Sequence, residues 1–272
     1  GENVNDQSEV GDTPILLALE ALNVTEVPWR SLKDELFTLI TAQIHKPETL
    51  NIRTQKKRLL PIISAVETGR PDVVKKILDL GADPNGRGLT DEETALNVCI
   101  KRIGILKDPE GFWKVQNEMN VTPEILDSVR RHSSGLSGFT LKHQENFLDN
   151  SNNDELFKEC SLLIKKLMTE RISEKMTISS MREIATLLIS YGADVNAEHL
   201  SPLKGYTPLM LAAELDEQKI FDAMLVAGGD INKKYIDPRT GREVSLLEIA
   251  KHFNSKRVMQ SLDDISSYAK FH

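Results

Sequence analysis

The stretches Gly-Ala-Asp-Val-Asn at residues 192–196 and Gly-Tyr-Thr-Pro-Leu-Met-Leu-Ala-Ala at residues 205–213 decide the fold of this chain. A glycine directly after a helix favours the left-handed conformation that ends it, and Asp and Asn side chains suit the turn that follows. A threonine before a proline is typical of a helix start, because threonine can accept a hydrogen bond from the first turn. This order predicts the end of one helix, a turn and the start of another.

Both stretches recur along the chain. The turn is repeated at residues 81–85 and, with substitutions, at 228–232 and 1–5, and the helix start is repeated at 11–19, 60–66, 94–100 and 245–250. Each start is followed by a second amphipathic segment, the clearest at residues 72–80, where the apolar side chains are spaced for one helical face. The sequence therefore predicts a series of helical hairpins.

The spacing of these features resembles that of the ankyrin repeat family. Pro61 and Ala95 lie 34 residues apart, and Gly192 and Gly228 lie 36 apart, close to the ankyrin period of about 33 residues. The resemblance implies an all-α fold, an ankyrin-repeat solenoid of about five helical hairpins. The family's histidine near the start of each repeat is absent, so the hydrogen bonds that it makes must be replaced.

The repeat pattern is interrupted between Ala95 and Pro208, which lie 113 residues apart. After one ankyrin period of about 33 residues is subtracted from this distance, about 80 residues have no place in the repeat pattern. We therefore expect residues 1–103 to form repeats 1 and 2 and the first helix of repeat 3, and residues 104–176 to form a helical insertion. The second helix of repeat 3, repeats 4 and 5 and a C-terminal cap follow in residues 177–272. The insertion either thickens the flank of the stack or forms a separate partner-binding lobe.

The two ends of the first repeat also depart from the family pattern. Pro14 and Pro61 lie 47 residues apart, so the first repeat is longer than the others. The first five residues resemble the turn that ends a repeat. Either an earlier repeat has been cut away, or the stack starts with an unusual cap.

Composition excludes several classes of function. The chain has 272 residues and a net charge of −7, which gives no reason to expect nucleic-acid binding. No apolar run approaches the length of about 18 residues that a membrane span needs. The two cysteines, Cys99 and Cys160, form no disulfide framework or zinc quartet, and the histidines show no metal spacing. We expect a monomer without cofactor or metal in the cytoplasm, with a nuclear location left open.

The resemblance implies that the chain binds a protein partner, without catalysis, through the concave face and the turn tips. Apolar, aromatic and arginine side chains at such tips favour contact with a partner. The residues expected to bind are Arg87, Leu200, Leu203, Tyr206, Tyr235, Ile236 and Arg239. As an alternative, Tyr235 and Ile236 pack on Leu200 and Leu203, so that the longer tips cover one another.

Two further hypotheses concern chemistry and biology. Cys160 with His143 could provide a nucleophile and a base, which would make the insertion an active site; a catalytic domain in another part of the parent chain is the other enzymatic alternative. Degenerate ankyrin arrays with inserted segments also resemble effectors that intracellular bacteria deliver into host cells. That resemblance implies a host protein as the partner and the host cytosol as the location.

Overall fold

The computed structural model divides the chain into two compact units, which are residues Gly1–Gly104 with Lys175–His272, and residues Ile105–Glu174. The structure describes residues 7–8, 12–24, 30–52, 60–88, 93–109, 111, 166, 169–170, 172–199, 205–237 and 240–271. For Arg30 and residues 267–271 it describes the backbone alone. Most residues of the expected insertion lie outside the described residues, and the account below concerns the first unit.

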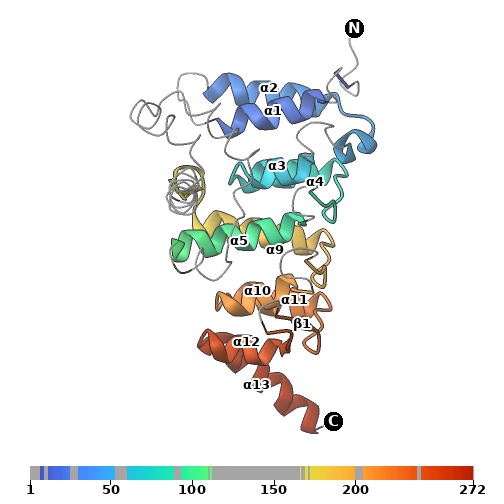
Figure 1. The fold of residues 1–272 in the computed structure, drawn as a ribbon. Coiled ribbons are helices and arrows are strands. Elements are labelled where there is room, and N and C mark those ends of the chain that lie inside the picture. Colours follow the sequence, from blue (N-terminus) through green and yellow to red (C-terminus); the bar gives the residue numbers. More distant parts are fainter. Residues whose placement is uncertain are drawn as a thin grey trace, which may run out of the picture. The chain divides into compact units, whose positions relative to one another are not determined.

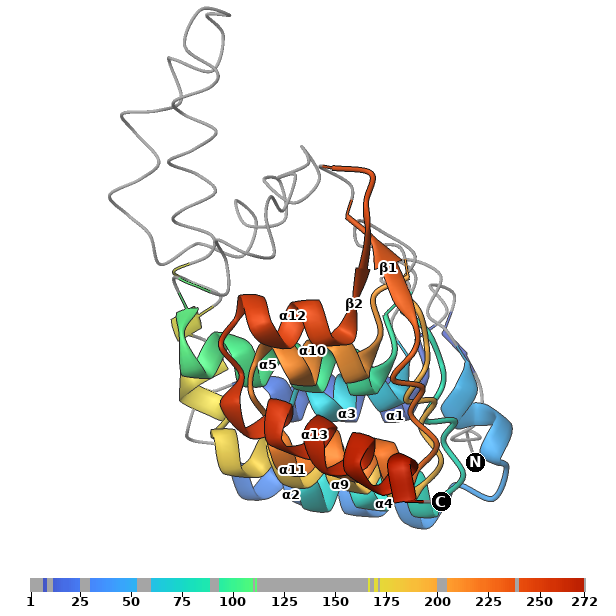
Figure 2. The ribbon, with the colours of Figure 1, turned by 90° about the horizontal axis from the view of Figure 1, so that it is seen from below.

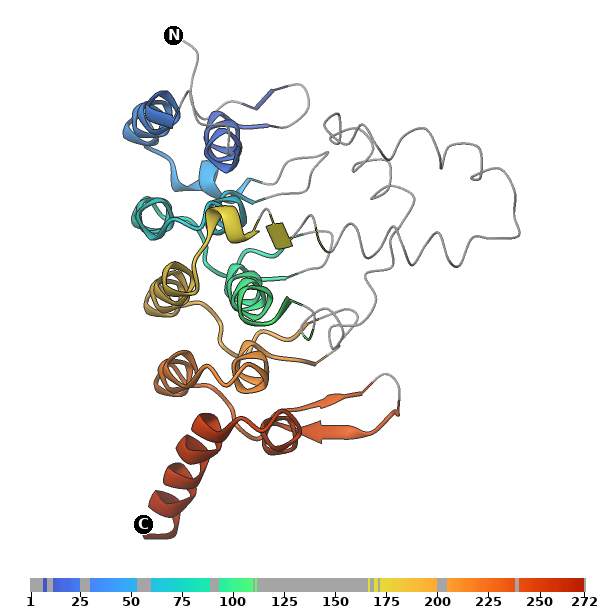
Figure 3. The ribbon, with the colours of Figure 1, turned by 90° about the vertical axis from the view of Figure 1, so that its left-hand side faces the viewer.

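The helices of the first unit lie in two columns, which Figures 1 and 2 show from the side and from below. One column holds α1 (Pro14–Asn23), α3 (Pro61–Val66), α5 (Ala95–Lys107), α10 (Pro208–Glu214) and α12 (Leu246–His252). The other column holds α2 (Arg30–Ala42), α4 (Pro71–Asp79), α9 (Ile178–Ser190), α11 (Gln218–Val226) and α13 (Lys256–Phe271). Within the columns, contacts join α1 to α3, α4 to α9, α9 to α11, α10 to α12 and α11 to α13. The layers are therefore stacked one on the next (Figure 3). In such a stack each layer covers apolar surface of its neighbour.

The expected helix starts are confirmed, although their caps differ. Proline occupies the first helical position of α1, α3 and α10. The Thr207 hydroxyl accepts a hydrogen bond from the Met210 N–H at 3.3 Å, as expected for an N-cap. Thr13 makes no such bond; its hydroxyl is buried without a partner among the described residues. The structure offers no explanation for this difference.

The expected helix ends are also confirmed at Gly81, Gly192 and Gly228, which have φ values of 95°, 85° and 91°. This left-handed conformation is costly for residues with a Cβ atom, so glycine ends each helix with little strain. In the turn that follows, an Asp carboxylate accepts from the backbone N–H two residues later, at 2.8–2.9 Å.

An asparagine ladder joins these turns across the layers. The side-chain oxygens of Asn51, Asn85 and Asn196 accept from the N–H groups of Asp83, Asp194 and Asp230 at 2.8, 2.6 and 2.8 Å. The side-chain amides of the same asparagines donate to the carbonyls of Gly81, Gly192 and Gly228 at 3.5, 3.0 and 2.9 Å. The last residue of each turn therefore satisfies backbone groups of the next turn, which sets the spacing of the layers.

Asn51 belongs to this ladder although no Gly-Ala-Asp motif precedes it. It ends η2 (Pro47–Asn51), a short 3-10 helix that follows α2. The long first repeat thus contains α2 and η2 within the described residues, and the other stretches that lengthen it lie outside them. The sequence pattern did not identify Asn51 because only the final residue of the motif remains.

Two arginine–glutamate pairs brace adjacent layers. Arg102 of α5 donates to Glu67 at 2.6 Å, and Arg182 of α9 donates twice to Glu217 at 2.8 and 2.9 Å. The two members of each pair lie 35 residues apart, about one repeat. Interrepeat polar contacts are therefore present without the family's histidine.

The chain is mostly helical, as expected, and its described residues also contain a small antiparallel sheet. Strands β1 (Lys234–Ile236) and β2 (Glu243–Ser245) pair in the last hairpin, where the sequence pattern predicted no strand. Cys99 of α5 is fully buried, and burial raises the pKa of its thiol. Its Sγ donates to the Met181 carbonyl of α9 at 3.0 Å, so Cys99 packs between these two helices.

Candidate partner-binding surface

Three segments connect a turn to the helix that follows it, before α5, α10 and α12. We call the described parts of these segments tips 1, 2 and 3. Tip 1 contains residues 86–88 and 93–94, tip 2 residues 197–199 and 205–207, and tip 3 residues 233–237 and 240–245. Each tip is closed by antiparallel backbone pairing: Arg87 with Thr94, His199 with Tyr206, and β1 with β2. The backbone of each tip is thereby fixed at its base.

Basic side chains join each tip to its neighbour. The Arg87 guanidinium of tip 1 donates to the Glu198 carbonyl of tip 2 at 3.0 Å. Lys233 of tip 3 donates to the Glu198 carboxylate at 2.6 Å and to the Asn196 carbonyl at 3.3 Å. Because Glu198 is bound from both sides, tip 2 is held between tips 1 and 3.

A buried polar cluster joins tip 1 and tip 2 to α5. Glu93 forms an ion pair with Lys101 of α5, and its Oε1 lies 3.5 Å from Nε2 of His199. Burial, together with the positive charges of Lys101 and Arg87, lowers the pKa of His199 to about 3. His199 is therefore neutral near pH 7 and acts as a packing group.

Two tyrosines join tips 2 and 3. The Tyr206 and Tyr235 rings meet edge to face, with centroids 4.8 Å apart. Tyr206 is only 4% exposed, and its hydroxyl donates to the Glu214 carboxylate at 2.7 Å. Burial and the neighbouring carboxylate raise the pKa of Tyr206, which keeps this donor protonated. Tyr206 was expected to contact a partner, but its burial gives it a structural role, and we leave it out of the proposed contact surface.

Ile236 is the prominent apolar side chain of tip 3. It is 58% exposed on β1, whereas Tyr235 beside it is partly covered. The flanking Lys234 and Glu243 form an ion pair at 3.0 Å across the two strands. An exposed β-branched side chain on a rigid hairpin, with neighbouring charges already paired, suits contact with an apolar site on another protein.

Among the expected binding residues, the structure therefore brings Arg87 and Tyr235 into the network that fixes the tips and leaves Ile236 exposed. Leu200, Leu203 and Arg239 lie outside the described residues, as do Cys160 and His143. The network residues Glu198 and Lys233 were not singled out from the sequence, because the contact between Arg87 and Glu198 spans 111 positions. Their only sequence signal is their place on turns of adjacent repeats.

The described residues do not support two other kinds of site. In this part of the chain, no helix combines the length and apolar character needed to cross a membrane. The same residues contain no group of three or more His, Cys, Asp or Glu side chains placed to hold a metal ion.

Comparison with known proteins supports the repeat interpretation. Residues 204–235 match the family model of the ankyrin repeat. This span contains α10 and α11 and reaches from tip 2 to tip 3, so the resemblance stated from the sequence is confirmed there. No curated protein matches the chain significantly.

Proposed function

We propose that this chain is a non-catalytic protein-recognition module, built as an array of about five ankyrin-type hairpins in which residues 104–176 interrupt the third. The ankyrin match supports protein interaction in general. The observation that carries our more specific proposal is the network of Arg87, Glu198 and Lys233, together with the paired rings of Tyr206 and Tyr235.

Such a network favours binding because it fixes the surface before a partner arrives. Ordering of loops and side chains on association opposes binding by about 0.5–1.5 kcal/mol for each immobilised side chain. Tips that are already joined to one another avoid much of this cost. We therefore propose that the partner contacts tip 3 through Ile236 and Tyr235, and adjacent parts of tips 1 and 2.

We propose a partner in the cytosol of a host cell, in the manner of bacterial effectors. This proposal is supported by the degenerate repeats and by the long segment between Ala95 and Pro208. A eukaryotic cell extract is therefore the appropriate source of candidate partners.

The test compares proteins captured from that extract by the wild-type chain and by an Ile236→Asp variant. We expect the specific partner to be lost or weakened by about tenfold or more, because a buried contact of about 1.5–3 kcal/mol is replaced by a desolvated charge. Val226→Asp is the matched control, since Val226 is 91% exposed on α11 in the other column.

Equal capture by the wild type and Ile236→Asp would contradict the proposed surface. Loss with both variants would indicate a general effect on the array. Circular dichroism and thermal unfolding of each variant establish that the fold is intact. A catalytic alternative is tested in parallel with Cys160→Ala and His143→Ala, which should leave capture unchanged.

A further inference from the structure

Asn85 is the one asparagine of the chain that a glycine follows directly. The peptide nitrogen of glycine has no side chain beside it and its backbone adopts conformations closed to other residues, so it can approach the side-chain carbonyl carbon of the preceding asparagine. Attack by that nitrogen closes a succinimide ring and releases the side-chain amide. Asn85 and Gly86 therefore carry the local chemistry of a deamidation site.

The folded stack holds both reacting groups in hydrogen bonds. The Asn85 amide donates to the Gly192 carbonyl at 3.0 Å, and its side-chain oxygen accepts from the Asp194 N–H at 2.6 Å. The Gly86 N–H donates to the Asp83 carbonyl at 3.3 Å. The Asn85 side chain must leave both partners in the next layer before its carbonyl carbon can turn toward the Gly86 nitrogen. The reaction therefore waits for a local opening of this joint.

The link that Asn85 makes also closes the longest loop of the asparagine ladder. Its partners lie 107 and 109 positions along the chain. The partners of Asn51 lie 30 and 32 positions away, and those of Asn196 lie 32 and 34 away. Residues 105–174 account for this difference, and a longer loop makes closure entropically more costly.

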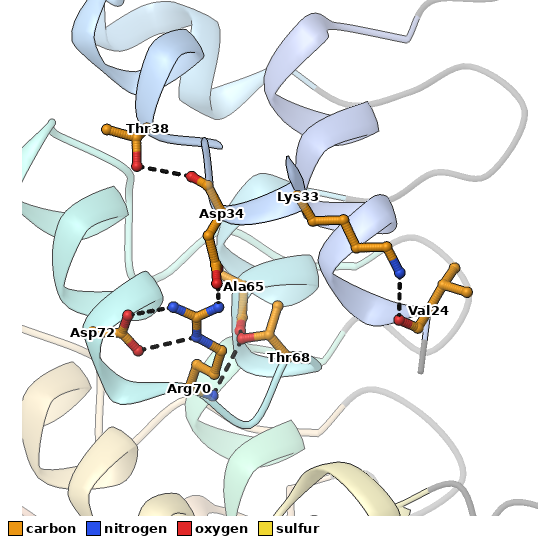
Figure 4. Close-up of polar contacts among 8 residues, drawn as sticks. All are labelled: Val24, Lys33, Asp34, Thr38, Ala65, Thr68, Arg70 and Asp72. Carbon is orange, nitrogen blue, oxygen red and sulfur yellow. Dashed lines mark hydrogen bonds and ion pairs between the residues drawn. The ribbon is translucent and has the colours of Figure 1, made fainter. Parts of the chain in front are cut away.

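In the column of α2, α4 and α9, the joint before Asn85 has a stronger polar contact. Arg70, at the start of α4, forms an ion pair with Asp34 of α2, as Figure 4 shows. Between α4 and α9, the Tyr191 hydroxyl donates to the Asp79 carboxylate, which also pairs with Lys75 of its own helix. Tyr191 and Asp79 are both exposed, so water competes for this contact. The bonds of Asn85 are therefore important for keeping this joint closed.

We propose that Asn85 is a deamidation site that the closed stack protects, so that opening of the joint becomes a lasting chemical change. Once the joint opens, the Gly86 nitrogen loses its proton to solvent and bonds to the Asn85 side-chain carbonyl carbon. The bond from that carbon to the amide nitrogen breaks, and the nitrogen takes up a proton and leaves as ammonia. Water then adds to the ring and opens it to aspartate or isoaspartate.

The product cannot restore the original link. A carboxylate at position 85 has no proton to donate to the Gly192 carbonyl, and its charge repels that oxygen. Isoaspartate also lengthens the backbone within the turn. The contact between Arg87 and Glu198 starts two residues later, so the same change loosens the link between tips 1 and 2. The site itself depends on no partner, so this inference stands or falls independently of the proposed function.

The test incubates the full chain at mildly alkaline pH, in buffer and in urea, and follows each asparagine by peptide mass spectrometry. We expect Asn85 to lose its amide about tenfold or more slowly in buffer than in urea, because the native chain reacts only when it opens. Asn196 is the matched control, since it makes the same two bonds to the next turn but is followed by Ala197. It should keep its amide far longer in both conditions.

Two outcomes of this experiment would overturn the proposal. Equal rates at Asn85 and Asn196 in urea would show that position 85 is not a preferred site. Equal rates at Asn85 in buffer and in urea would show that the stack does not protect it. Neither comparison requires a variant that must fold.

A pair of variants then identifies the joint that controls the reaction. Met181 of α9 and Met224 of α11 are both fully buried, so truncation of either leaves a cavity. Met181 also accepts the bond from Cys99 that joins α9 to α5. In buffer, Met181→Ala should speed the loss of the Asn85 amide by about threefold or more over Met224→Ala, because it loosens the contacts of α9 itself. Equal rates would contradict control by this joint.

The lasting effect is measured on Asn85→Asp, which carries the aspartate product. This variant should unfold at a lower urea concentration than the wild type, because the donor to Gly192 is lost. Asn232→Asp is its control, since no described residue bonds to the Asn232 side-chain amide. A wild-type unfolding curve for Asn85→Asp, or equal losses in the two variants, would overturn the claim that deamidation weakens the joint.

Discussion

At the scale of single residues, the asparagine that closes each turn joins two layers. Asn85 donates to the Gly192 carbonyl at 3.0 Å and accepts from the Asp194 N–H at 2.6 Å. Replacement by alanine removes both bonds. We expect Asn85→Ala to lower the free energy of unfolding by about 1–2 kcal/mol, with water replacing part of the loss at this exposed site. Urea unfolding followed by circular dichroism measures the effect.

Asn232 provides the control for this experiment. It occupies the same position in the last turn, where its backbone N–H donates to the Asp230 carboxylate at 2.9 Å. Among the residues that the structure describes, none bonds to the Asn232 side-chain amide. Asn232→Ala should therefore change stability little. Similar losses from Asn85→Ala and Asn232→Ala would show that turn propensity, and not the link between layers, explains the role of asparagine.

At the scale of elements, the sequence predicted the helices, because their ends and faces are determined by residues close together in the chain. Examples are the proline at the start of α10, Gly192 at the end of α9 and the apolar face of α4. Each of these signals affects only residues near it in the sequence, so the helices could be placed. The contacts of the candidate site could not be placed in this way. Arg87 bonds to Glu198 across 111 positions, and the burial of Tyr206 depends on Glu214 and on the ring of Tyr235. Such contacts appear only once the layers are stacked.

The helix ends at Gly81 and Gly192 share a sequence motif but differ in the space around the glycine. Gly81 and Gly192 both have positive φ, so alanine strains either position by about 1–2 kcal/mol. A Cβ atom at Gly81 would also lie 2.9 Å from Cβ of Pro47 in η2, whereas one at Gly192 meets nothing within 4 Å. We expect Gly81→Ala to lower the melting temperature more than Gly192→Ala does. Equal shifts would indicate that η2 moves aside without cost.

At the scale of the whole molecule, the first unit brings together two segments separated by residues 105–174. The join rests on contacts within that unit. Met181 of α9 is fully buried and accepts a hydrogen bond from Cys99 of α5, and Met176 lies directly against Gly69. Because each layer hides its apolar face only against its neighbours, the segments on either side of the excursion should stabilise each other.

This argument gives a test by excision. Replacing residues 105–174 with a short Gly/Ser linker should leave a helical chain that unfolds in one cooperative transition, because the contacts between α5 and α9 are retained. Urea unfolding followed by circular dichroism tests for this single transition. The dependence of the free energy of unfolding on urea concentration should also decrease, in proportion to the surface that the deletion removes. A second splice that keeps α5 to Lys107 and resumes at Ile172 guards against a linker that is too short. If both splices unfold gradually or aggregate, residues 105–174 help to hold the stack together. The contacts of the third hairpin would then not be enough to join the segments on either side.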